Sequence, residues 1–98
     1  MAEIRVTTSE VRNKAQELRQ LNSQFKTQVE SMVNQEASLA GMWEGEAQQA
    51  FRSTFNNDKA QFDAFYNVIE QYATALDNIA TEYDNKEALN QSLAASRQ

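Results

Sequence analysis

Carboxylates are the only abundant side chains in this sequence that could act in catalysis or bind a metal ion. Aspartate and glutamate together number 14, whereas histidine and cysteine do not occur. Without imidazole or thiol groups, the chain has no nucleophile–base pair and few of the ligands that zinc prefers. Asp84 and Glu87 lie near enough in sequence to hold a cation weakly, but we interpret such scattered acids as a solvated surface. We therefore predict no enzymatic activity, no metal site and no cofactor.

The chain has two glycines and no proline, and both glycines lie close to its only tryptophan. Gly41 and Gly45 flank Trp43, and their spacing matches neither nucleotide-binding glycine pattern. Because the remaining residues include no strong helix breaker, we predict a single chain reversal at residues 41–45. Gly41 is expected to adopt the left-handed conformation that ends a helix. Trp43 is expected to cover the end of the resulting hairpin.

A first helix is predicted over residues 8–40. Thr7 is a candidate N-cap, and Glu10 follows it at the spacing of a capping box. Apolar residues then recur every seven positions: Val11, Leu18, Phe25, Met32 and Leu39. The row beside them is weaker: Thr8, Ala15, Asn22, Val29 and Glu36.

A second helix is predicted over residues 46–84, followed by a tail at 85–98 that either extends this helix or frays. Two apolar heptad rows support it: Phe55, Phe62, Ile69, Leu76 and Tyr83, and then Phe51, Phe65, Tyr72 and Ile79. Tyr66, Ala73 and Ala80 widen the stripe on one side. The whole chain is expected to form one domain.

The fold class predicted from these rows is all-α, an antiparallel two-helix hairpin. Two helices cannot cover an apolar stripe this wide, and each large side chain left in water forgoes about 1.5–3 kcal/mol. We therefore expect two hairpins to pair into a four-helix bundle dimer. The predicted bundle core consists of Leu18, Phe25, Met32, Phe51, Phe55, Phe62, Phe65, Ile69, Tyr72 and Leu76.

Three polar residues, Asn22, Glu36 and Asp58, interrupt the apolar rows. Each is interpreted either as an edge residue that reaches water or as a group that fixes the register of packing. Four acids, Asp77, Glu82, Asp84 and Glu87, crowd the predicted carboxyl end of the second helix, where the helix dipole disfavours negative charge. This end is interpreted either as frayed or as suited to a basic partner surface.

The formal net charge of −5 argues against binding to nucleic acids or to anionic lipids. The first residues lack the apolar segment of a signal peptide, and no stretch approaches a membrane span, so we expect neither a cleavable signal nor stable membrane insertion.

Trp43-Glu44-Gly45, at the midpoint of a helical hairpin of about a hundred residues, resembles the WXG family of small type VII (ESX or Ess) secretion substrates, the early-secretory-antigen-like proteins. The resemblance extends over the whole chain. It implies a non-enzymatic protein of a Gram-positive bacterium, secreted without a cleavable signal and cytoplasmic before export. It also implies export as a folded dimer, either with itself or with a related WXG-type protein. A virulence or export-accessory role follows from the same resemblance.

The family resemblance further implies a carboxy-terminal export signal of the form Tyr-x-x-x-Asp/Glu. Tyr83 and Glu87 match this signal and share one helix face, although Tyr66 and Glu70 have the same spacing. In the implied bipartite arrangement, the Trp43–Gly45 turn of one subunit lies near the tail of the other. The secretion ATPase is the expected reader. Homodimers and heterodimers both occur in such families, and the near-unbroken heptads favour a homodimer here.

Two other functions share this fold. One is an intracellular adaptor that accompanies a larger secreted toxin as a chaperone would. The other is a membrane-active effector that inserts its aromatic stripe into lipid, which the negative charge disfavours at neutral pH.

Overall fold

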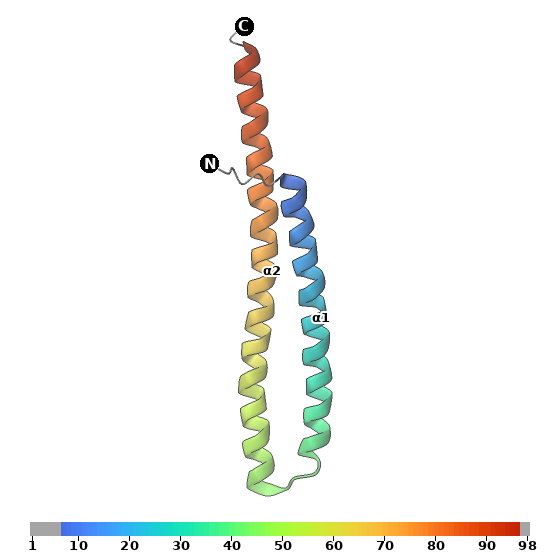
Figure 1. The fold of residues 1–98 in the computed structure, drawn as a ribbon. Helices are drawn as coiled ribbons and strands as arrows, with labels where there is room; N and C mark the ends of the chain where they lie inside the picture. The colour runs from blue at the N-terminus through green and yellow to red at the C-terminus, as the bar shows by residue number, and fades with distance from the viewer. Residues whose placement is uncertain (1–6, 97–98) are drawn as a thin grey trace, which may run out of the picture.

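The computed structural model describes residues 7–96, and these form a helical hairpin (Figure 1). Helix α1 spans Thr8–Ala40 and helix α2 spans Gly45–Ser96. The two helices lie side by side and run antiparallel, joined by a short turn at one end of the molecule. The predicted all-α hairpin is therefore confirmed. Neither helix in the described range combines the length and the apolar character needed to cross a membrane.

Helix α1 begins with the predicted cap. Thr7 is extended, with ψ of 151°, and its hydroxyl oxygen accepts a hydrogen bond of 3.1 Å from the backbone N–H of Glu10. This bond satisfies one of the four N–H groups that the first turn of any helix leaves without an internal partner. The capping threonine therefore sets where α1 starts.

Small residues, rather than the large apolar ones, occupy the contact between the helices. Ala15 and Val29 of α1 and Ala73 and Ala80 of α2 are buried. Ala15 and Val29 belong to the weaker of the two heptad rows of the first helix. Ala73 and Ala80 belong to the residues that widen the apolar stripe of the second helix. Because alanine lets two helices approach closely, the hairpin uses its small residues internally and leaves its large ones outside.

Asn22 is buried between the helices, with 3% of its surface exposed. Its side-chain amide nitrogen donates to the carbonyl oxygen of Tyr66 at 2.9 Å and to a carboxylate oxygen of Glu70 at 3.0 Å. The interpretation of Asn22 as an edge residue that reaches water is therefore wrong. The alternative, in which a buried polar group fixes the register of the two helices, agrees with these bonds.

Two arginines of α1 form ion pairs with acids of α2 along one edge of the hairpin. Arg12 lies 2.8 Å from Asp84, and Arg19 lies 2.5 Å from Asp77. The two arginines are seven residues apart on α1, and the two aspartates are seven residues apart on α2. The two ion pairs are therefore successive steps of one ladder. Asp77 and Asp84 therefore meet the basic surface of α1 in the same chain, which corrects the interpretation that they await a basic partner. Glu36, another polar residue of the apolar rows, pairs with Arg52 at 3.5 Å.

Helix α2 follows the first of the two alternatives given for the tail, since it continues through residues 85–96 and ends at Ser96. Residues 85–96 contain no proline or glycine and include several alanines and leucines, which favour helix. The segment continues beyond the first turn of α1, so that α2 overhangs its partner helix at the end that carries the C-terminus (Figure 1). Helix propensity alone thus extends α2 where α1 no longer supports it.

Candidate functional site

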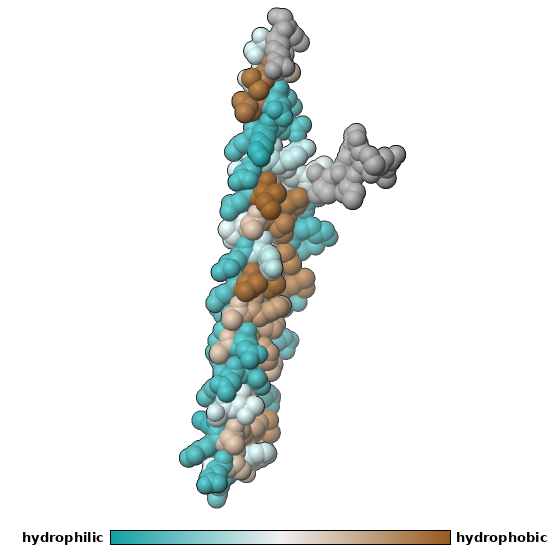
Figure 2. Space-filling model, turned by 90° about the vertical axis from the view of Figure 1, so that its left-hand side faces the viewer, coloured by the Kyte–Doolittle hydropathy of each residue, from teal (hydrophilic) through white to brown (hydrophobic). Residues whose placement is uncertain are grey.

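The most prominent feature of the hairpin is a set of large apolar side chains that lie along its length, outside the contact between the helices. Phe25 of α1 anchors it, with its ring centroid 6.2 Å from that of Phe62 and 5.3 Å from that of Phe65. Both contacts are edge-to-face, an arrangement that aromatic pairs favour. Figure 2 shows apolar residues gathered along the length of one side of the rod, with a further group near its C-terminal end.

None of the ten residues predicted to form the bundle core is buried within the hairpin. Seven of them are half-buried: Leu18, Phe25, Phe51, Phe55, Phe62, Ile69 and Leu76. Three are exposed: Met32, Phe65 and Tyr72. These residues, together with the exposed Leu21 and Ile79, are called the apolar face below. No large side chain of the described residues is fully buried, so the hairpin alone does not contain a core of large residues.

The turn between the helices differs in detail from the prediction. Gly41 has φ of −64° and ψ of −18°, which is right-handed, and the N–H groups of Met42 and Trp43 close the last turn of α1 through bonds to Leu39 and Ala40. The left-handed residue is Gly45, with φ of +67°. Helix α1 ends in a tightened turn, so Gly41 stays right-handed. The left-handed backbone that glycine permits occurs four residues later, at Gly45.

Trp43 packs against the start of α2 and remains half exposed. Its ring centroid lies 5.5 Å from that of Phe51, and 48% of its surface is accessible. Gln48 holds the turn from the other side, since its side-chain amide donates to the carbonyl oxygen of Ala40 at 2.8 Å. The turn therefore presents an indole that is fixed at one edge and open at the other. Gln48 has no motif signal, and sequence reasoning missed it.

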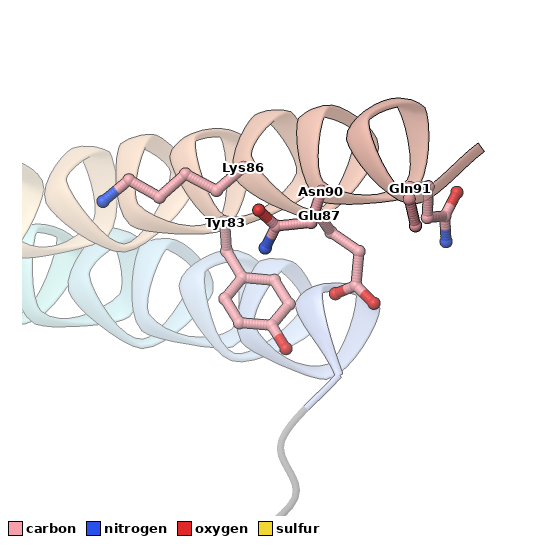
Figure 3. Close-up of a pocket in the computed structure, with 6 residues that line it drawn as sticks. Tyr83, Lys86, Glu87, Asn90 and Gln91 are labelled. Atoms are coloured by element: carbon pink, nitrogen blue, oxygen red, sulfur yellow. The ribbon is translucent and has the colours of Figure 1, made fainter. Parts of the chain in front are cut away.

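Tyr83 and Glu87 lie where α2 passes the first turn of α1, and both are exposed. Figure 3 shows their side chains projecting from the same side of α2, around a shallow hollow that Lys86, Asn90, Gln91 and Ala94 also line. A surface that contacts the tyrosine ring can therefore reach the glutamate carboxylate as well.

The second Tyr-x-x-x-Glu match is engaged inside the hairpin. Tyr66 is half-buried, with the Lys26 ammonium 5.1 Å from its ring centroid, and Glu70 accepts the hydrogen bond from Asn22. The two matches have the same spacing but differ in accessibility. Tyr66 and Glu70 contact α1, whereas Tyr83 and Glu87 lie where α2 passes the end of α1.

The acids of residues 7–96 lie spread along both helices. Among the described residues, no group of three or more His, Cys, Asp or Glu side chains lies close enough to hold an ion. Asp84 is engaged by α1, and hydrogen bonds from Arg12 and then Thr8 hold the pKa of its carboxyl below its usual value. Its negative charge is thus already neutralised locally by a guanidinium.

Comparison with solved structures relates this hairpin to EsxB, described as a secreted protein of Bacillus anthracis strain Sterne. The wild-type EsxB structure is 28% identical, with a TM-score of 0.76 over 87% of this chain and 91% of EsxB. The selenomethionine-labelled EsxB structure gives the same identity and TM-score over 89% of this chain and 99% of EsxB. The search of curated proteins returned no match.

The family comparison covers nearly all of the helical hairpin. The family described as "Proteins of 100 residues with WXG" matches residues 3–88, a range that contains both the turn with Trp43 and the apolar face. With the fold, the central Trp-x-Gly and this match in agreement, the chain belongs to the WXG100 family.

Proposed function

We propose that this chain is a substrate of a type VII secretion system and leaves the cell as a folded dimer. The apolar face carries the dimer part of this proposal. Phe65, Tyr72 and Ile79 are each more than half exposed in the single hairpin, which no stable water-soluble rod maintains at low energetic cost.

The accessible surface area of the hairpin agrees with a missing partner. It measures 7953 Å² for a chain of 11.1 kDa, whereas a compact monomer of this mass exposes about 5,700 Å². The excess, roughly 2,300 Å² by the same relation, is the size of surface that each subunit of a permanent dimer buries. A second hairpin laid on the apolar face would cover it and complete a four-helix bundle.

The partner is a second copy of this chain, with a related WXG-type protein as the alternative. The acids of the ion-pair ladder are matched by arginines of the same chain, so the hairpin needs no complementary charge from another protein on that edge. The apolar face is chemically similar to itself, which suits a symmetric pair.

Export by type VII secretion is supported by family membership and by the description of EsxB as secreted. The protein would be cytoplasmic before export and would need no cleavable signal. Its signal is proposed to be bipartite, formed by the Trp43–Gly45 turn of one subunit and the tail of the other. Tyr83 and Glu87 are the tail residues proposed for recognition, and the secretion ATPase is the proposed reader.

An export assay in a bacterium that encodes a type VII system tests this function. Wild-type protein is expected in the medium, and deletion of the secretion ATPase should retain it in the cells. Tyr83→Ala and Glu87→Gln should be retained, and light scattering on both purified variants checks that they still dimerise, since Tyr83 ends an apolar heptad row. Glu82→Gln, an exposed acid nearby, is the matched control and should be exported. Normal export of both signal variants would contradict the assignment of Tyr83 and Glu87.

Size-exclusion chromatography with light scattering tests the dimer separately, and a folded monomer at micromolar concentration would contradict it. The adaptor function predicts that the protein stays inside a strain lacking its cargo. The membrane-active function predicts leakage of liposomes between pH 7 and pH 5, whereas the proposed secretion substrate causes none.

A further inference from the structure

Seven residues of α2 recur every seven positions and make up one heptad row, of which Phe51, Phe65, Tyr72 and Ile79 belong to the apolar face. This outer row consists of Phe51, Asp58, Phe65, Tyr72, Ile79, Lys86 and Leu93. Its one acid and its one base are placed symmetrically, since Asp58 lies 14 residues before Tyr72 and Lys86 lies 14 residues after it. The apolar members are symmetric as well, with Phe65 and Ile79 next to the centre and Phe51 and Leu93 at the ends.

The outer row is open to contact along most of its length. Phe65 is 53% exposed, Tyr72 60% and Ile79 57%, and Leu93 on the overhang is 47% exposed. Asp58 and Lys86 are exposed too, and neither takes part in the ion pairs found within residues 7–96. A charge of each sign is therefore available within an otherwise apolar row.

We propose that a second copy of this chain packs on the apolar face with the twofold axis passing beside Tyr72. In this antiparallel arrangement the α2 helices of the two copies lie against each other. Asp58 then faces Lys86 of the partner subunit, and Lys86 faces Asp58 of the partner subunit. This inference rests on the proposed homodimer and adds its register and its charged contacts.

Only one register of the outer row pairs both of its charges. If the axis passes beside Phe65 instead, Asp58 faces Tyr72 of the partner subunit, and Lys86 falls beyond the row. If the axis passes midway between Phe65 and Tyr72, Asp58 faces Ile79 of the partner subunit, and Lys86 faces an aromatic ring. The first alternative leaves Asp58 only the partner's Tyr72 hydroxyl as a donor and no opposite charge, and the second places its carboxylate against apolar surface, which is costly on burial. The Tyr72 register avoids this cost.

Helix α1 supports the same axis. Asn22 bonds to Tyr66 and Glu70, and Arg19 to Asp77, so the intervening Leu21 lies beside the segment of α2 that contains Tyr72. Leu21 is 61% exposed, close to the value for Tyr72, and it shares a helix face with Leu18 and Phe25. An axis that crosses both helices at this level brings Leu21 against Leu21 of the partner subunit.

The overhang of α2 also acquires a role in this register. Leu93 faces Phe51 of the partner subunit, and Leu89, which is 58% exposed, comes level with Phe55 of the partner subunit. The part of α2 that extends past α1 would therefore pack beside the turn of the other copy. In a register centred on Phe65, both leucines would remain in water.

Single-cysteine crosslinking measures the register directly, because the natural chain contains no cysteine. A disulfide requires the two Cα atoms to lie within about 7 Å. Tyr72→Cys places its thiols together at the axis and should give a covalent dimer under mild oxidation. Phe65→Cys is the matched control, since its two thiols would lie about 21 Å apart at 1.5 Å per residue and should stay unlinked.

Charge reversal tests the proposed ion pair. Asp58→Lys and Lys86→Asp should each weaken dimerisation by about tenfold or more, since each dimer would then contain two like-charge contacts. The double variant Asp58→Lys/Lys86→Asp should restore the dissociation constant to near that of the natural chain. Glu30→Lys controls for the change in net charge, because this exposed residue lies on the opposite side of α1 from Phe25 and Met32 and should leave the constant unchanged.

The outcomes separate the register from the dimer itself. A natural chain that is monomeric by light scattering would remove the proposed homodimer together with this inference. A dimer that crosslinks through Phe65→Cys, or one that the double charge reversal fails to restore, would overturn the register and leave the dimer intact.

Discussion

Gln48 connects the two helices across the turn: its side-chain amide nitrogen lies 2.8 Å from the carbonyl oxygen of Ala40, the last residue of α1. The same carbonyl oxygen also accepts the backbone N–H of Trp43 at 3.2 Å, so Gln48 supplies its second donor, and because Ala40 is buried, water cannot readily replace this bond. The first turns of α2 thereby close the end of α1 and hold the segment that carries Trp43.

Replacing Gln48 with alanine should lower the free energy of unfolding by about 1 kcal/mol, because the carbonyl of Ala40 loses a donor. Alanine is a better helix former than glutamine, so helix propensity would work against this loss. Thermal or urea unfolding followed by circular dichroism measures the change. Gln49→Ala alters the neighbouring exposed glutamine and should be neutral or slightly stabilising. Equal stability of the two variants would show that the bond to Ala40 contributes nothing.

The two glycines of the turn should respond to alanine in opposite directions. Gly45 has φ of +67°, so Gly45→Ala should destabilise the protein by about 1 kcal/mol even though no atom lies within 4 Å of the added Cβ. Gly41 is right-handed, and its added Cβ would meet the carbonyl oxygen of Ser38 at an ordinary 3.4 Å. Gly41→Ala should therefore leave the stability unchanged or raise it by up to about 0.5 kcal/mol. Comparable destabilisation of both variants in urea unfolding would be inconsistent with this turn geometry.

Asn22 offers a test of how a buried polar group is retained between the helices. Its amide nitrogen has two acceptors, but its side-chain oxygen is buried without a hydrogen-bond partner among the described residues. Asn22→Leu should therefore raise the free energy of unfolding by about 1 kcal/mol, because it removes an unsatisfied group from an otherwise apolar contact. Calorimetry on both proteins gives the sign. A lower melting temperature for the leucine variant would mean that the bonds to Tyr66 and Glu70 outweigh the unsatisfied oxygen.

The contribution of Asp84 to the stability of the folded protein should decrease in acid. Hydrogen bonds from Arg12 and Thr8 lower the pKa of Asp84 in the folded state, so the folded protein binds this proton less readily than the unfolded chain. The resulting stabilisation is present above the unfolded pKa and is lost as the pH falls through the lowered folded pKa. Asp84→Asn should melt below the natural protein at pH 7, and the two should converge in strong acid. Arg12→Gln should reduce the same acid dependence, and a constant difference between Asp84→Asn and the natural protein at every pH would contradict this linkage.

The helices themselves were predictable because their determinants are local. Thr7 caps α1 through a residue three positions away, and the absence of proline and of interior glycine leaves both helices uninterrupted. The central Trp-x-Gly placed the turn and indicated the family. The heptad rows also showed that a single hairpin cannot cover its large side chains, since the width of a stripe is a property of the sequence alone.

Tertiary packing decided which residues of each helix are buried in the hairpin and which remain exposed. The sequence ranks Phe25 above Asn22 as an interior residue, yet the structure buries Asn22 and leaves Phe25 half-buried, because closely spaced helices accommodate small side chains between them. The pairing of Asp84 with Arg12 and the contact of Gln48 with Ala40 likewise join residues that no local pattern relates. Such contacts depend on how two helices align along their length, which the spacing of residues within each helix does not specify.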